Sequence, residues 1–181
     1  MIILIGLGNP GEKYKNTRHN VGFMAIDAFA KQNNLADFEL QKKSNALISK
    51  NEDVVLVKPQ TFMNESGKSV KQILSNTNSS NLVVIHDDID LPIGKIKIVK
   101  ERGSAGHKGV ESIINNIGND GLIRFRIGIA SPHKTEAIKV VLENFSAGEQ
   151  KILDETIQKV VSALDMYIKD GLDKTMNEYN K

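Results

Sequence analysis

The stretch Met1–Gly22, MIILIGLGNPGEKYKNTRHNVG, decides how the amino-terminal half of the chain folds. Its apolar run Ile2–Ile5 is rich in β-branched residues and is followed by glycine, which predicts a buried strand. Segment 6–11 is rich in glycine and contains a proline, which predicts a sharp turn. The polar segment after it has no helical or strand period, yet it groups four chemically versatile side chains: Tyr14, Arg18, His19 and Asn20. Functional sites are commonly built on polar loops at the ends of central strands, so we expect the site here.

The composition is that of a globular protein, with 181 residues of which 40% are hydrophobic. This length fits one domain, spanning 1–181, with a substantial core. The absence of cysteine excludes disulfides, thiolate catalysis and cysteine-based zinc sites. The chain shows no apolar run of membrane-spanning length and no secretory leader pattern. We therefore expect a cytoplasmic protein that does not bind membranes.

The charge is distributed unevenly, although its net value is only +2. Basic residues gather in one region and continue further along the chain: Lys95, Lys97, Lys100, Arg102 and Lys108, then Arg124, Arg126 and Lys134. Such a strip can contact phosphates. Most basic strips are only solvated surface, so this one does not establish nucleic-acid binding by itself.

Strand-like and helix-like patterns alternate along the rest of the chain. Strands are predicted at 38–41, 46–49, 54–57, 82–85, 95–100 and 124–130. Amphipathic helices are predicted from near Asn20, after Asn64, after the glycine-rich segment 103–109, and along a stripe from Leu153 to Ile168. These patterns predict an α/β fold, in which helices flank a mixed and largely parallel sheet.

Polar side chains follow three of these strands, at the point where each strand is predicted to end. Asn9 follows the first strand, Asn64 follows 54–57, and Asp87 follows 82–85. Sites of open α/β sheets form beyond the carboxyl ends of the strands. We therefore expect these three residues to meet at that edge.

The segment GLGNPG matches the dinucleotide-binding pattern G-x-G-x-x-G, but its context does not. That pattern works when a helix begins within it and directs its N-terminus at the pyrophosphate. Here a polar segment intervenes, and Asp27, at the distance of the expected acidic residue, lies inside a predicted helix. We reject the dinucleotide interpretation.

His19 is a candidate general base, because imidazole titrates near neutrality and its neighbours are polar. An adjacent carboxylate such as Asp87 would orient it, although Asp87 and Asp88 could instead cap a turn. His86 could be structural, and His133 lies in a predicted loop. A metal site from His19, Asp87 and His107 is conceivable, but the spacings do not match helical metal motifs, so we predict no metal. GxSxG is absent, which favours activated water over a serine nucleophile.

Five segments together resemble bacterial peptidyl-tRNA hydrolases, in order and along nearly the whole chain. They are GLGNPGEKYKNTRHNVG (6–22), KPQTFMNESG (58–67), HDDIDLPIG (86–94), GSAGHKG (103–109) and RFRIGIA (124–130). The resemblance implies a monomeric α/β esterase that cleaves the bond between a peptide and the 3′ ribose of tRNA. It also implies that no cofactor is needed and that the partner is peptidyl-tRNA, through its acceptor end and nascent peptide.

The resemblance also implies a role for each matching residue. His19 matches the catalytic base, Asp87 its supporting carboxylate, and Asn9 the amide that selects N-blocked substrates. Asn64 matches a substrate contact near the base, although alone it could equally be a helix cap. Tyr14 and Phe62 match residues that line the channel for the tRNA end and peptide. Arg126, with Lys97 or Lys100, matches the phosphate-binding surface.

Lys108 departs from the family pattern, which has asparagine at this position. Lysine donates hydrogen bonds and carries charge but cannot accept, so we expect Lys108 to reach a phosphate of the tRNA acceptor end. The alternative is that it points into solvent. Two other functions remain open from the residues alone: a non-catalytic RNA-binding module, which needs only the basic strip, and a small-molecule esterase, which needs only His19 and Asp87.

Overall fold

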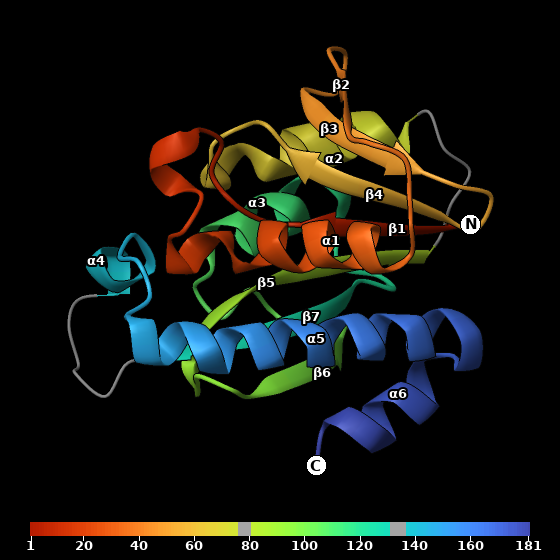
Figure 1. Cartoon of the computed structure of the whole chain (residues 1–181). Helices are drawn as coiled ribbons and strands as arrows, with labels where there is room; N and C mark the ends of the chain where they lie inside the picture. The colour runs from red at the N-terminus through yellow and green to blue at the C-terminus, as the bar shows by residue number, and fades with distance from the viewer. Residues whose placement is uncertain (76–80, 131–136) are drawn as a thin grey trace.

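In the computed structural model, which describes residues 1–75, 81–130 and 137–181, the strands form one mixed seven-stranded sheet of order β2-β3-β4-β1-β5-β7-β6 (Figure 1). The strands are β1 (Ile2–Gly6), β2 (Glu39–Gln41), β3 (Ala46–Lys50), β4 (Val54–Pro59), β5 (Asn81–Pro92), β6 (Ile96–Lys100) and β7 (Ile123–Ala130). β1 pairs in parallel with β4 and β5, and β5 pairs in parallel with β7, while β2, β3 and β6 are antiparallel to their neighbours. The predicted α/β fold with a largely parallel centre is confirmed.

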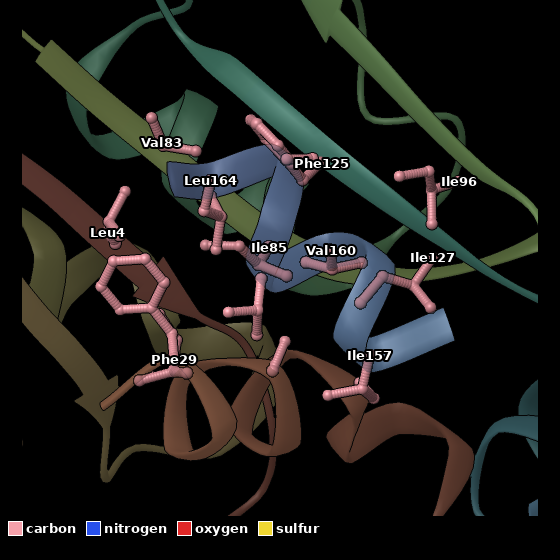
Figure 2. Packing of buried hydrophobic residues seen from close by; sticks show 14 of the residues in the cluster. Leu4, Phe29, Val83, Ile85, Ile96, Phe125, Ile127, Ile157, Val160 and Leu164 are labelled. Atoms are coloured by element: carbon pink, nitrogen blue, oxygen red, sulfur yellow. The ribbon is translucent and has the colours of Figure 1, made fainter. Parts of the chain in front are cut away.

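Helices cover both faces of the sheet, and the two faces form separate apolar clusters. The α-helices are α1 (Val21–Gln32), α2 (Ser66–Leu74), α3 (Lys108–Ile117), α4 (Ala137–Val141), α5 (Ala147–Asp170) and α6 (Leu172–Tyr179). In Figure 1, α1 and α5 lie in front of the sheet and α2 and α3 lie behind it. Alternate strand residues supply the two clusters, since Leu4 packs on the α1 and α5 side whereas Ile3 and Ile5 pack on the other. Figure 2 shows the first cluster, in which Phe29, Val160 and Leu164 meet β1 and β5.

β5 is longer than the sequence predicts. The prediction ended the strand at Ile85, but the strand continues through the polar residues and remains paired with β7 to Asp88. Its ladder becomes irregular only between Asp88 and Pro92. Polar residues are tolerated in this buried strand because His86 and Asp87 both have hydrogen-bond partners there. Asp87 therefore lies within a strand, where its backbone is fixed.

Three short 3-10 helices carry the polar segments at the ends of the strands: η1 (Glu12–Tyr14), η2 (Arg18–Asn20) and η3 (Met63–Glu65). η2 runs directly into α1, whose second residue is Gly22. A Cβ atom on Gly22 would lie 2.4 Å from the carbonyl oxygen of Ile85 and 2.5 Å from the amide nitrogen of Leu7. The missing side chain thus lets the start of α1 press against the ends of β1 and β5, which places η2 over the carboxyl ends of these strands.

β6 is an edge strand of the sheet, and a side chain occupies its outer hydrogen-bonding positions. The amide nitrogen of Ile98 donates to Oδ1 of Asn180 at 2.7 Å, and Nδ2 of Asn180 donates to the carbonyl oxygen of Ile98 at 2.9 Å. One amide side chain thereby pairs with both backbone groups of Ile98.

The predicted helix that starts near Asn20 begins at Val21, ten residues after Gly11, which agrees with the rejection of a dinucleotide fingerprint. None of the helices in the described ranges combines the length and the apolarity needed to cross a bilayer. His133 and Lys134 lie outside the described residues.

Candidate active site

A cleft of about 230 Å³ opens beside β5, and it contains most of the titratable residues that the sequence singled out. Its lining includes His19, Asp87, His107, Lys108 and Arg126. A larger groove of about 700 Å³ runs along α1 and α5, but amide and alkyl side chains dominate its lining. The smaller cleft is therefore the candidate active site.

His19 and Asp87 form a close pair inside this cleft. His19 lies on η2 and its Nδ1 is 2.7 Å from Oδ1 of Asp87, whose side chain is only 2% exposed. Burial favours the neutral carboxyl, but electrostatic interaction with His107 and hydrogen bonds from His107 and His19 outweigh it and hold the pKa of Asp87 far below its ordinary value. Asp87 is therefore a carboxylate at neutral pH, and the proton between the two groups belongs to Nδ1 of His19. Its Nε2 then carries the free lone pair.

His107 binds the same carboxylate oxygen and also caps a helix. Its Nε2 is 2.8 Å from Oδ1 of Asp87. Its Nδ1 accepts hydrogen bonds from the backbone amides of Gly109 and Val110, both at 3.2 Å, and so caps the N-terminus of α3. Because Nδ1 is the acceptor, the ring proton of neutral His107 must reside on Nε2, where it points at Asp87.

His86 holds the backbone of the strand at the same point. Its Nδ1 is 2.7 Å from the carbonyl oxygen of Asp87, and its Nε2 is 3.2 Å from Nη1 of Arg124. Burial, followed by His107 and Arg124, lowers the pKa of His86 well below its ordinary value, so the ring is neutral. The expectation that His86 is structural agrees with this geometry.

Arg124 corrects part of the predicted basic strip, because it is only 1% exposed and cannot belong to a phosphate-binding surface. Its guanidinium donates to the carbonyl oxygens of Arg102 and Gly103 and lies against His86. Burial, with Arg126 nearby, lowers the pKa of Arg124 to about 10, which leaves it charged at neutral pH. Arg124 and Arg126 occupy equivalent positions of one alternating strand, so the sequence gives no sign that Arg124 is the more deeply buried.

The ligand atoms of His19, Asp87 and His107 lie within 4.8 Å of one another, which is close enough to raise the metal question again. However, one carboxylate oxygen lies at hydrogen-bond distance from both ring nitrogens. A metal would need both nitrogens without their protons, and His107 could provide that only by breaking its cap on α3. The geometry favours a hydrogen-bonded triad over a metal site.

Asn9 presents an oriented amide next to Asn20, the residue after His19, but it lines a separate groove and not the cleft of Asp87. Its Oδ1 accepts from the backbone amide of Met63 at 2.9 Å, and its backbone groups exchange two hydrogen bonds with the side chain of Asn20. With Oδ1 engaged, Nδ2 must point the other way, and within the described part of the chain no partner is recorded for it. Asn9 therefore offers a free amide donor. The sequence grouped Asn20 with the site but did not predict that it positions Asn9.

Arg18, the residue before His19, forms an ion pair with Glu149 that could not be predicted from the sequence. Arg18 is 4% exposed and its Nη2 donates to both carboxylate oxygens of Glu149, at 2.9 and 2.8 Å. Glu149 also completes a capping box with Ser146 at the start of α5. The pair ties the residue before the candidate base to the first turn of a long helix. Only the S-x-x-E pattern of the capping box was visible in the sequence.

Of the remaining predicted residues, Arg126 and Lys108 line the cleft, whereas Tyr14, Phe62 and Asn64 are not among its lining residues. Arg126 lines the cleft and forms an ion pair with Asp88 through Nε and Oδ2. Lys108 is exposed and lies 3.0 Å from Glu111. Tyr14 lies on η1 beneath the ammonium group of Lys13.

Phe62 is the N-cap of η3 and Asn64 lies within that helix; both are exposed, Phe62 by 58%. An aromatic ring in this position is available for stacking. Asn64 does not cap α2, whose N-cap is Glu65 with no side-chain cap bond, so the capping alternative for Asn64 is wrong. Its amide remains available at the surface.

Comparisons with known proteins agree along the whole chain. A family model described as peptidyl-tRNA hydrolase matches residues 3–181. The peptidyl-tRNA hydrolase of Thermodesulfovibrio yellowstonii is 41% identical, with 100% of each chain covered. That of Lactococcus lactis subsp. cremoris is 39% identical over 98% of each chain. The crystal structure of peptidyl-tRNA hydrolase from Acinetobacter baumannii is 29% identical and superposes with a TM-score of 0.90, covering 99% of this chain and 94% of that one.

Proposed function

This chain belongs to the peptidyl-tRNA hydrolase family, and from that premise we propose that it hydrolyses the ester between a peptide and the 3′ ribose of tRNA with His19 as general base. The observation that carries this assignment is the 2.7 Å contact between His19 and the buried carboxylate of Asp87 in the cleft. Nδ1 of His19 donates to Asp87, so Nε2 is free to take a proton from water. The water then attacks the ester carbonyl, and the ribose hydroxyl leaves.

Asp87 contributes orientation and charge. It fixes the His19 ring with Nε2 toward the cleft, and its negative charge stabilises the imidazolium that forms as water is deprotonated. The backbone of Asp87 is held on both sides, by the ladder to β7 and by His86. A carboxylate on a backbone fixed in this way keeps its orientation toward His19.

Asn9 supplies the preference for N-blocked substrates. Its free Nδ2 is a donor, since Oδ1 is engaged by Met63. The amide carbonyl of a blocked substrate accepts such a hydrogen bond, whereas the ammonium group of free aminoacyl-tRNA is itself a donor. Asn64, exposed on η3, contacts the substrate near the base, and Phe62 and Tyr14 border the channel for the peptide and the tRNA end.

The tRNA approaches over the basic side of the cleft. Arg126 and Lys108 line this side, and Lys97 pairs with Arg126 across β6 and β7. Arg126 already binds Asp88, so a phosphate would share its guanidinium with that carboxylate. Lys108 is paired only with Glu111 at the surface, where such a contact is weak and easily exchanged for a phosphate. The enzyme acts as a monomer in the cytoplasm and needs no metal or other cofactor.

The proposal is tested by incubating purified protein with N-acetyl-aminoacyl-tRNA and with free aminoacyl-tRNA. We expect rapid cleavage of the blocked substrate, unaffected by EDTA, and slow cleavage of the free one. His19→Ala is expected to lower kcat by about a hundredfold or more, the scale of a general base, with tRNA binding retained. Binding without turnover would support an RNA-binding module, and equal turnover of a small ester would support a small-molecule esterase. Either result would overturn the proposal.

A further inference from the structure

We propose that His107 is a positioning residue for this reaction: the first turn of α3 holds its ring in the tautomer that donates to Asp87, and this second hydrogen bond sets how Asp87 supports His19. The inference rests on the proposed role of His19 as base. A side chain that caps a helix thereby also influences the chemistry of His19.

The tautomer follows from the cap. Nδ1 of His107 faces two backbone N–H groups, those of Gly109 and Val110, each at 3.2 Å. A proton on Nδ1 would point at these donors and would break both cap hydrogen bonds. The proton therefore stays on Nε2, 2.8 Å from Oδ1 of Asp87. The ring packs against His19 and His86, with centroids 5.0 and 4.6 Å away, which restricts its rotation.

Two imidazole N–H groups then share one carboxylate oxygen, and they have different tasks. His19 gives up or takes a proton at Nε2, because that nitrogen faces the cleft. The cap occupies Nδ1 of His107, so this ring contributes a donor to Asp87 through Nε2. The hydrogen bond from His107 fixes the plane of the Asp87 carboxylate. It also offsets part of the negative charge that would otherwise act on His19 alone. Loss of the His107 hydrogen bond would leave the charge of Asp87 to act on His19 alone.

Other charged groups surround this triad from neighbouring elements, and most are matched by a partner. They are Arg18 with Glu149 from α5, Arg126 with Asp88 across β7 and β5, Lys108 with Glu111 on α3, and Arg124 with His86. Only His107 and His19 donate side-chain hydrogen bonds to Asp87 among the described residues. His107 is thus the group through which the charge of Asp87 can be changed most directly.

Two substitutions at His107 separate the two functions of the ring. In His107→Asn the side-chain oxygen can replace Nδ1 as the cap, but no donor reaches Asp87. In His107→Gln the side-chain nitrogen can replace Nε2 as the donor, but the cap is lost. We expect the Asn variant to move the acid limb of the pH profile of kcat/KM upward by about half a pH unit or more, with Tm close to that of wild type. We expect the Gln variant to keep the acid limb and to lose about 2–4 °C in Tm, the scale of one lost cap.

Ser112→Ala provides a control for general loosening of α3. Oγ of Ser112 accepts a hydrogen bond from the amide of Gly67 at 3.0 Å, away from the triad. This variant is expected to lower Tm without moving the acid limb. If Ser112→Ala moves the acid limb as far as His107→Asn does, or if His107→Asn leaves it unmoved, the proposal is overturned.

Nuclear magnetic resonance tests the tautomer without reference to activity. Long-range proton–nitrogen correlation spectra of ¹⁵N-histidine-labelled protein identify which ring nitrogen of His107 is protonated. We expect the Nε2–H form throughout the pH range of activity, and an Nδ1–H or doubly protonated ring in that range refutes the proposal even if the variants fail to fold. A His19→Ala enzyme with near wild-type turnover would instead refute the proposed function, so the two failures are distinguishable.

Discussion

Replacing Asp87 by asparagine removes the charge that supports His19 while keeping the shape of the side chain. The charge of an imidazolium is spread over the ring, so its centre lies about 4 Å from the carboxylate when Nδ1 and Oδ1 are 2.7 Å apart. At an effective dielectric constant of about 20, this pair attracts by about 4 kcal/mol. If His19 carries about half of the proton in the transition state, about 2 kcal/mol is lost, which lowers the rate about 30-fold. Because both histidines donate to Oδ1, the amide oxygen takes that position and the geometry is kept.

The assay is steady-state hydrolysis of N-acetyl-aminoacyl-tRNA, with kcat and KM measured separately. The loss is expected in kcat, since Asp87 acts through His19 and not on the tRNA. Asp90→Asn makes the same chemical change on the same strand at an exposed position and is the matched control, for which we expect wild-type kcat. A fall of less than about threefold in kcat for Asp87→Asn would refute the electrostatic reasoning.

Three further predictions concern stability, pH and tRNA binding. Gly22→Ala is expected to cost at least about 2 kcal/mol in the free energy of unfolding, because its Cβ would meet backbone atoms. Gly148→Ala in α5, with nothing within 4 Å of its Cβ, should be neutral or stabilising by about 0.5 kcal/mol. Urea titrations compare the two variants, and equal losses would contradict this packing. The folded-state pKa of Asp87 lies below its unfolded value, so the stability that this carboxylate contributes is complete above about pH 4 and is lost as pH falls further. Wild type should therefore lose more stability than Asp87→Asn between pH 5 and 3. Parallel curves of unfolding free energy against pH for the two proteins would argue against this contribution. Lys108→Asn and Arg126→Ala should raise KM at low salt and flatten its salt dependence while kcat stays similar; an unchanged KM at every salt concentration would show that the residue concerned contacts no phosphate.

The sequence predicts the strands well wherever they are continuous apolar runs or regular alternations. Ile2–Ile5 and Leu82–Ile85 are buried on both faces, which is typical of central parallel strands. The extension of β5 through His86 and Asp87 could not be predicted, because adjacent polar residues normally mark a loop. They remain in the strand because tertiary contacts satisfy them, and a local pattern does not contain those contacts.

Some parts of the candidate site could likewise be predicted from the sequence, and others could not. His19 and Asp87 could be predicted to lie close together, because each comes after an apolar run that predicts a strand and parallel strands bring their carboxyl ends to one edge. The support behind them depends on long-range pairing: Arg18 and Glu149 are 131 positions apart. His107 lies in the glycine-rich segment before a predicted helix, but its contact with Asp87 depends on the tertiary fold. Arg124 shows where prediction from charge fails, since charge predicts an exposed side chain and this one is buried.

The contact between Asn180 and Ile98 has a consequence for self-association. An edge strand with free N–H and C=O groups is a template on which the edge of another molecule can add. At the other edge, β2 is only three residues long, which offers little to extend. At β6 the amide of Asn180 occupies the place that a neighbouring chain would take, and Lys97 and Lys100 keep the rest of that edge charged. The outer edge of β6 is thereby blocked from pairing with the edge of another copy, and its lysines add charge repulsion between copies.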